Sequence, residues 1–367
     1  MKERENPLRR LNAAGQSVWC DYLTRTMLRS GELERLVEQD DLRGVTTNPT
    51  IFDKAISGGA AYDEQIRREC ETAGASDPRS LFFSLAVEDI REAARQLRPV
   101  FERTGGVDGR VSLEVSPDLA YDTEGTVEEA LTLYQRVAAR NVMIKVPATR
   151  QGLPAISRLV AEGISVNATL LFSRERYDEV VDAYLRGLEK RAEAGEPVDE
   201  IASVASFFVS RLDSALDPVL EKRRPEWVGG AAVANARLAY QRFLSHISDT
   251  RFRRLRELGA RPQRLLWAST GTKNPAYSDV LYVESLCGPD TVNTMPPATY
   301  EAFRDHGNVD PEALTRGVEQ AQELLEGLAE LEIDLAEVTE QLERDGVAAF
   351  RQSFDNLLSH LGEKMVA

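Results

Sequence analysis

The chain has 367 residues, of which 45 are lysine or arginine and 60 are aspartate or glutamate, so its formal net charge is -15. An acidic chain repels the phosphates of nucleic acids and of anionic membranes, which argues against either as the main partner, although a local cationic pocket can still bind a small phosphorylated metabolite. The start of the chain has no apolar signal-peptide core, and no later stretch approaches the ~20 apolar residues of a membrane span. A soluble cytoplasmic protein is therefore expected.

Eight apolar runs of strand length alternate with helical patterns along most of the chain. The predicted strands are residues 17–23, 44–48, 110–115, 141–147, 165–172, 203–209, 264–270 and 291–295. Helical periodicity is found in 30–39, 85–104, 126–140, 154–163, 174–195 and 234–247, and the interval 53–109 is long enough for more than one helix. Alternating strands and helices predict an α/β fold with a parallel sheet, and eight units favour a (β/α)8 TIM barrel over an open doubly wound sheet.

The last part of the chain, from Pro311 onward, is acidic, has a helical pattern and contains no predicted strand. We expect one domain over residues 1–367, in which the helical segment 311–367 packs on the barrel or covers its mouth. Charged helical stretches of this kind are more often solvated faces than docking sites.

The cysteines give no sign of a disulfide framework or a zinc site. Cys20, Cys70 and Cys287 are far apart and have no histidine companions at ligand spacing. The stretch "GTKNP" (271–275) lacks the spacing of a nucleotide-binding P-loop. Neither a metal nor an organic cofactor is expected.

The alternation of side chains divides each predicted strand into two faces. In "VMIKV" (142–146), Lys145 and Met143 lie opposite the three β-branched residues, and in "VNATL" (166–170), Asn167 and Thr169 lie opposite an apolar face that includes Leu170. The second face of five consecutive strands carries a polar residue near the C-terminal end, namely Asp21, Asn48, Glu114, Lys145 and Thr169. Barrel enzymes place their chemistry at this end, so we expect these side chains to meet in the interior.

Lys145 is the least expected of these residues, because burial in an apolar strand removes water from its charge. One interpretation is a structural network in which Lys145 pairs with Asp21 or Glu114. The convergence of five polar positions favours a functional site instead, because an ion-pair network can often be replaced by apolar packing without loss of stability. A lysine beside two carboxylates suits amine catalysis on a carbonyl substrate, with the carboxylates as acid and base and Thr169 holding a water molecule.

Several segments resemble the transaldolases. "GVTTNPTIF" (44–52) and "VMIKVPATRQGLPAI" (142–156) resemble the two signatures of that family, and "SLEVSP", "NATLLFS" and "SVASFFVSR" match further family segments in the expected order. The resemblance implies a (β/α)8 barrel that moves a dihydroxyacetone unit from sedoheptulose 7-phosphate to glyceraldehyde 3-phosphate, giving erythrose 4-phosphate and fructose 6-phosphate. It makes Lys145 the Schiff-base nucleophile, Asp21 the acid/base for carbon–carbon cleavage, and Glu114 with Thr169 the pair that handles the catalytic water.

The candidate substrate-binding residues surround this catalytic set. They are Thr46, Asn48, Asn167, Ser206, Phe208, Arg211, Ser269 and Lys273. By resemblance, Asn48 and Ser206 would hydrogen-bond the three-carbon unit, and Arg211 and Ser269 fall where the family binds phosphate. Many relatives have an arginine where this chain has Lys273, and lysine supplies charge without the bidentate fork of arginine.

Two alternatives follow from the same residues. Relatives that act as fructose 6-phosphate aldolases have a tyrosine at the position of Phe208 and a glutamine at that of Glu114, so this chain favours the transferase. The second alternative is a catalytically silent barrel that binds sugar phosphates or a protein partner. Small-molecule sugar phosphates are the expected partners, and the chain is expected to be a monomer or a homodimer.

Overall fold

The eight predicted strands form a closed parallel barrel in a computed structural model that describes residues 6–72 and 77–366. The strands are β1 (Gln16–Cys20), β2 (Gly44–Val45), β3 (Arg110–Glu114), β4 (Val142–Pro147), β5 (Val166–Leu171), β6 (Ser203–Phe208), β7 (Gln263–Ala268) and β8 (Thr291–Met295). Neighbours in the chain are hydrogen-bonded, and β8 pairs with β1. The predicted TIM barrel is confirmed, and the open doubly wound sheet is excluded.

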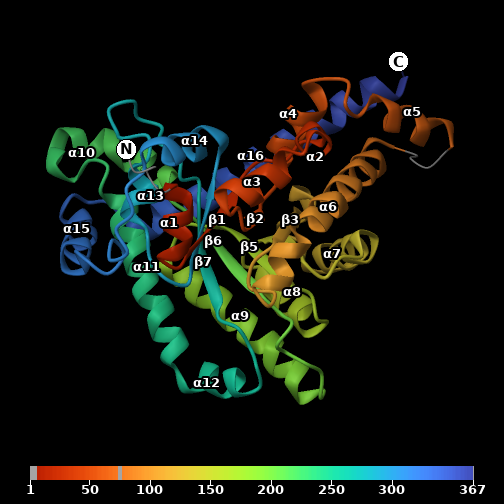
Figure 1. The fold of residues 1–367 in the computed structure, drawn as a ribbon. Coiled ribbons are helices and arrows are strands. Elements are labelled where there is room, and N and C mark those ends of the chain that lie inside the picture. Colours follow the sequence, from red (N-terminus) through yellow and green to blue (C-terminus); the bar gives the residue numbers. More distant parts are fainter. Residues whose placement is uncertain (1–5, 73–76, 367) are drawn as a thin grey trace.

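Helices surround the barrel on its outer side (Figure 1). They are α1 (Pro7–Ala13), α2 (Arg25–Ser30), α3 (Glu32–Asp40), α4 (Pro49–Ser57), α5 (Asp63–Glu71), α6 (Pro78–Arg103), α7 (Thr123–Val137), α8 (Gly152–Ala161), α9 (Arg174–Glu193), α10 (Ser210–Arg223), α11 (Ala231–Ser248), α12 (Thr250–Glu257), α13 (Leu281–Ser285), α14 (Pro297–His306), α15 (Val318–Glu330) and α16 (Leu335–Val366). The interval 53–109 holds α5, α6 and the end of α4, so the expectation of more than one helix there is confirmed.

The helix predictions were incomplete in three respects. The pattern at 30–39 is broken at Gly31, which has a φ of 77° and ends α2 before α3 begins. The helices α1, α10, α12, α13 and α14 were not predicted, and in α10 Pro218 interrupts the pattern of an ordinary helix. The segment after Pro311 forms turns up to Gly317, so the helical part starts only at Val318.

The strands β1 and β2 end three residues before their predicted ends, and this moves two site residues into loops. Asp21 follows β1, which ends at Cys20, and Asn48 lies three residues beyond the end of β2. Asn48 is the N-cap of α4, because its Oδ1 accepts a hydrogen bond from the Ile51 amide at 3.0 Å and Pro49 begins the helix. The last residue of the predicted strand 44–48 is therefore the N-cap of a helix and not part of β2.

The two faces of the strands separate as the alternation predicts. Val142, Ile144 and Val146 pack in the core between sheet and helices, whereas Met143 belongs to a second apolar cluster inside the barrel that also contains Trp19. The side chains of this inner cluster fill the barrel below the polar end, so the cavity described below has a packed apolar floor.

Leu170 does not follow the predicted alternation. Its φ is 62°, and the pairing of β5 with β6 shifts register between Ala168 and Leu171. This irregularity turns Leu170 from the predicted outer face into the inner cluster, where it joins Phe350.

The C-terminal helix α16 lies across the carboxyl end of the barrel. It contacts α4, α5, α6, α10 and β5, and in Figure 1 it passes behind the barrel toward α4 and α5. At Gly346 a Cβ atom would lie 2.9 Å from the side chain of Leu170, so glycine permits the close approach of helix and strand. Among residues 6–72 and 77–366, no helix is long and apolar enough to cross a bilayer.

Candidate active site

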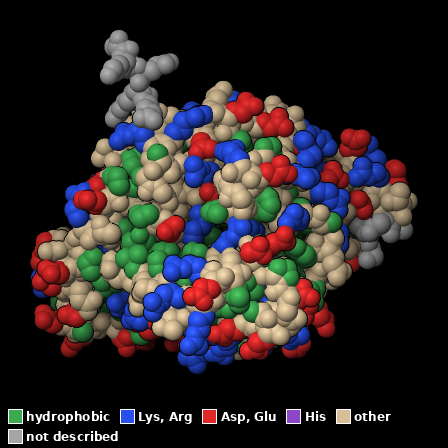
Figure 2. Space-filling model, turned by 60° about the horizontal axis from the view of Figure 1, so that its bottom comes forward, with side chains coloured by type: hydrophobic (Ala, Val, Ile, Leu, Met, Phe, Trp, Pro, Cys, Tyr) green, Lys and Arg blue, Asp and Glu red, His purple; other side chains and the backbone are tan. Residues whose placement is uncertain are grey.

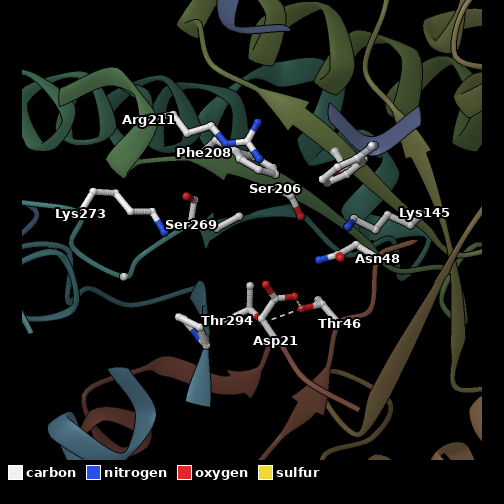
Figure 3. Close-up of a pocket in the computed structure, with 15 residues that line it drawn as sticks. Asp21, Thr46, Asn48, Lys145, Ser206, Phe208, Arg211, Ser269, Lys273 and Thr294 are labelled. Atoms are coloured by element: carbon white, nitrogen blue, oxygen red, sulfur yellow. Dashed lines mark hydrogen bonds between the residues drawn. The ribbon is translucent and has the colours of Figure 1, made fainter. Parts of the chain in front are cut away.

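A polar cavity of about 150 Å³ lies at the carboxyl ends of the strands, beneath α16. Figure 3 shows how its side chains point inward from different strands and loops. Ten of the twelve candidate residues line it, namely Asp21, Thr46, Asn48, Lys145, Thr169, Ser206, Phe208, Arg211, Ser269 and Lys273. The other two, Glu114 and Asn167, lie directly behind this lining.

Lys145 reaches the cavity from β4, between two strands that hold its partners in register. The strand pairing places Lys145 beside Glu114 on β3 and beside Asn167 on β5. Its Nζ lies 3.0 Å from Glu114 Oε2 and donates to the Thr47 carbonyl at 3.1 Å. The Lys145 side chain is 5% exposed, and this remaining surface faces the cavity, so a small substrate can reach the amine.

Asp21 lies on another side of the same cavity. Its Oδ1 accepts a hydrogen bond of 2.6 Å from Thr46 Oγ1, which is also 2.6 Å from Thr294 Oγ1. Burial raises the pKa of Asp21, while the charge of Lys145 and the Thr46 hydrogen bond oppose the rise. The carboxyl group therefore holds a proton at a higher pH than a free aspartate does, as a group that exchanges protons with a substrate requires.

Glu114 lies behind Lys145 at the end of β3. Burial raises the pKa of Glu114, and the adjacent Lys145 opposes this rise. Within the described chain, Glu114 Oε1 and Thr169 Oγ1 are both buried and have no hydrogen-bond partner. Buried polar atoms of this kind usually bind water or a ligand, so the two residues are suited to hold a small polar molecule near Lys145.

Asn48 and Ser206 present polar atoms to the cavity from opposite sides of Lys145. Because the Oδ1 of Asn48 caps α4, its amide nitrogen remains free to donate into the cavity. Ser206 Oγ donates to Asn167 Oδ1 at 2.7 Å, and Asn167 Nδ2 donates to Ser112 Oγ at 3.0 Å. Asn167 is fully buried, and its hydrogen bond fixes the orientation of the Ser206 hydroxyl.

Two cations stand at the end of the cavity away from Lys145 (Figure 3). Arg211, at the start of α10, lies with its Cζ 5.1 Å from the centre of the Phe208 ring. Burial lowers the pKa of Arg211, and Asp345 on α16 opposes the change. Lys273 is an exposed residue on the loop after β7, near Ser269, whose φ of 56° turns the chain at the end of that strand.

The sequence reasoning missed several lining residues. Phe350 of α16 covers Lys145, with the centre of its ring 5.3 Å from Nζ, and Thr294 of β8 completes the hydroxyl chain at Asp21. The alternation in residues 291–295 could have revealed Thr294, because it shares a face with the interior residue Val292. Nothing local in the sequence marks Phe350, which reaches the site only through the position of α16.

The described residues contain no group of side chains suited to bind a metal ion. In the two described stretches, 6–72 and 77–366, no three His, Cys, Asp or Glu side chains are grouped so that they could hold an ion. Cys20, Cys70 and Cys287 are unpaired thiols, and Cys20 and Cys287 are buried. The polar side chains that line the cavity are those of lysine, arginine, aspartate, asparagine, serine and threonine.

A closed eight-stranded parallel barrel with ionisable residues at its carboxyl end defines a (β/α)8-barrel enzyme. Residues 18–361 match the sequence model of the transaldolase/fructose-6-phosphate aldolase family. The chain is 48% identical over 363 residues to a transaldolase of Parafrankia sp. (strain EAN1pec), covering 98% of each chain. It is 45% identical to a transaldolase of Trichodesmium erythraeum and 49% identical to one of Mycobacterium tuberculosis, covering 98% and 96% of each chain. The chain belongs to the transaldolase family.

Proposed function

We propose that this chain transfers a dihydroxyacetone unit from sedoheptulose 7-phosphate to glyceraldehyde 3-phosphate, with erythrose 4-phosphate and fructose 6-phosphate as products. The observation that carries the proposal is the cavity itself, in which Lys145 faces two ionisable carboxyl groups at one end and Arg211 with Lys273 lies at the other. A phosphorylated ketose has its carbonyl and its phosphate at opposite ends, which matches this distribution of charge. The near full-length similarity to transaldolases supports the same activity.

The first step joins Lys145 to the donor ketone. The neutral amine attacks the carbonyl carbon, the resulting carbinolamine loses its hydroxyl as water, and an iminium is left on Lys145. Glu114, 3.0 Å from Nζ, can take the ammonium proton, and a water held by Glu114 and Thr169 can pass protons to and from the departing oxygen. Glu114 Oε1 and Thr169 Oγ1 have no hydrogen-bond partner among the described residues, so both are available to hold this water.

The second step breaks the carbon–carbon bond beside the iminium. Asp21 takes the proton from the hydroxyl on the far side of that bond, the aldose phosphate leaves as an aldehyde, and the bond electrons form an enamine on Lys145. The enamine carbon then attacks the acceptor aldehyde, Asp21 returns the proton, and water releases the new ketose from Lys145. In this proposal Asn48 and Ser206, which both line the cavity, hydrogen-bond the retained three-carbon unit throughout.

The test of this proposal is dependence on an acceptor. With fructose 6-phosphate as donor, turnover should be fast when erythrose 4-phosphate is added and slow without it. Free dihydroxyacetone appearing at a comparable rate without acceptor would identify a fructose 6-phosphate aldolase. Absence of any borohydride-trapped adduct on the peptide containing Lys145 would identify a catalytically silent barrel.

The activity should fall at acid pH because Asp21 must accept a proton. Since burial raises the pKa of Asp21 above 3.8, the loss should begin at a higher pH than for a free aspartate, as the pH falls through the raised value. The measurement is kcat/KM for fructose 6-phosphate across the acid range, with circular dichroism at each pH to confirm that the fold persists. An acid limb at or below the ordinary aspartate range would contradict the role of Asp21 as base.

The loop that carries Lys273 is tied to the helix that carries Arg211. Tyr277 donates a hydrogen bond of 2.6 Å to Asp217 of α10. The Tyr277→Phe variant should therefore raise the KM for the phosphorylated donor ~3- to 10-fold with little change in kcat, because one hydrogen bond that fixes a binding cation is lost. Tyr121→Phe, at a residue that is 52% exposed, is the matched control. An unchanged KM, or an equal fall in kcat, would show that this tie does not position the phosphate site.

Sugar phosphates are the proposed partners, and the proposal includes a cytoplasmic location. The proposal also includes a monomer or a homodimer. Sedimentation of the purified protein distinguishes these two states.

A further inference from the structure

A second cavity, of about 320 Å³, lies at the opposite end of the barrel from Lys145. The loops that lead into β3, β5, β6 and β7 form its wall, through residues such as Gly106, Ser165 and Arg261. Figure 2 presents this end of the molecule and shows lysine and arginine side chains beside a hollow near its centre. The steps proposed for ketose transfer do not use these residues.

Arg110, the first residue of β3, lies at the inner side of this cavity and is only 1% exposed. Its Nε and Nη2 donate to the Gly106 carbonyl at 3.0 and 2.6 Å, and its Nη1 donates to Ser165 Oγ at 3.0 Å. Its Cζ lies 5.2 Å from the centre of the Phe101 ring. All of these partners are uncharged, and no carboxylate in the described stretches lies within 4.0 Å of Arg110. A buried charge without a counter-ion is unusual in proteins.

Arg261 adds a second guanidinium without a carboxylate partner. Its Nη2 donates to the Gly105 carbonyl at 2.7 Å, while its Nη1 is buried and has no hydrogen-bond partner among the described residues. Burial, and then repulsion by Arg261 and Arg264, lower the pKa of Arg110 to about 9. The nearby carboxylate of Asp108 cannot neutralise this group, because it already pairs with Arg264 at 2.9 Å and with Arg43 at 3.7 Å.

The acidic residues of the cavity lie at its rim. Glu102, Asp199 and Glu200 are exposed, and Glu200 pairs with Arg140 at 2.5 Å. Carboxylates in contact with water are screened and oppose an anion at the inner arginines only weakly. The inner part of the cavity is therefore positive, while the acidic rim repels large polyanions.

We propose that this cavity binds a small oxyanion of the phosphate class between Arg110 and Arg261. A tetrahedral oxyanion matches guanidinium groups through paired N–H donors, and it would use the Arg261 Nη1 that lacks a protein partner. The ligand is inorganic phosphate or a compact phosphate monoester. Its site is separate from the phosphate end of the ketose cavity, where Arg211 and Lys273 lie.

Calorimetric titration with inorganic phosphate tests this site in the Arg211→Gln background, which weakens the ketose-phosphate end. One phosphate should still bind, and adding Arg261→Gln should weaken that binding at least ~10-fold, because a charge-assisted contact is lost. Arg253→Gln, an exposed change of the same charge on α12, is the control and should leave the binding unchanged. Glucose 6-phosphate, titrated in the same variants, shows whether the cavity accepts a monoester as well as the free ion.

Crystals soaked in arsenate give an independent result in the otherwise unaltered protein. An anomalous peak between Arg110 and Arg261, absent in Arg261→Gln, is expected. The proposal would be overturned if phosphate affinity were equal with and without Arg261→Gln. It would also be overturned if arsenate bound only in the cavity that contains Lys145. Either result would give the two arginines a purely structural role. Because Arg261 is only partly buried, its replacement is less disruptive to folding than replacement of Arg110.

Discussion

Replacing Lys145 with arginine is expected to abolish ketose transfer, lowering kcat by at least ~10⁴-fold, because arginine keeps the positive charge but cannot form a Schiff base at neutral pH. Glu114, 3.0 Å from Nζ, would still face a cation, so the loss reports the nucleophile more directly than a neutral substitution would. The measurement couples erythrose 4-phosphate-dependent turnover of fructose 6-phosphate to borohydride trapping.

Peptide mass analysis makes the Lys145 experiment specific. In the unmodified chain the trapped adduct should lie on the peptide containing Lys145, and in Lys145→Arg no peptide should carry it. Lys222→Arg, at an exposed position of α10, is the control and should retain full activity. Residual turnover near the unmodified level, or an adduct on another lysine, would refute the assignment of Lys145.

The Asp21→Asn variant should form the Schiff base but fail to break the carbon–carbon bond. Asparagine cannot take the proton from the substrate hydroxyl, so kcat should fall by ~10²- to 10⁴-fold. Its amide can still accept the hydrogen bond from Thr46, which spans 2.6 Å in the unmodified chain, so the local structure should persist.

The size of the trapped adduct separates the two steps. With fructose 6-phosphate, the unmodified protein should yield a three-carbon adduct on Lys145, whereas Asp21→Asn should accumulate the uncleaved six-carbon phosphate adduct. A three-carbon adduct formed at an undiminished rate in Asp21→Asn would assign the cleavage to another base. Thr294→Val is a useful comparison, since it removes only the hydroxyl 2.6 Å from Thr46 Oγ1.

The predictable part of the site is the part that strand geometry determines. The alternation put Lys145, Glu114 and Asn167 on the inner face of their strands, and Glu114 was an expected partner of Lys145. The register of the parallel strands places both Glu114 and Asn167 directly beside Lys145. The same argument placed Met143 inside the barrel, where it is found. The order of the strands in the barrel could be predicted from their number and from their alternation with helices.

The parts that strand alternation could not predict depend on irregular backbone and on distant packing. Leu170 changes face because β5 is irregular there, and a periodic pattern cannot reveal a positive φ at a leucine. Asn48 owes its orientation to the cap of α4 rather than to β2. Phe350 reaches Lys145 only because α16 packs across the mouth, a placement decided by tertiary contacts with α4, α6 and β5.

The position of Phe350 over Lys145 has a consequence for the order in which the site is completed during synthesis. The strands that carry Asp21, Glu114 and Lys145 emerge from the ribosome long before α16, so the barrel sheet can begin to assemble while Lys145 is still open to the cell's aldehydes and ketones. The amine becomes enclosed only when α16 docks, since its cover comes from that helix. The cover of Lys145 is thus made last, because the helix that carries Phe350 follows all eight barrel strands in the chain.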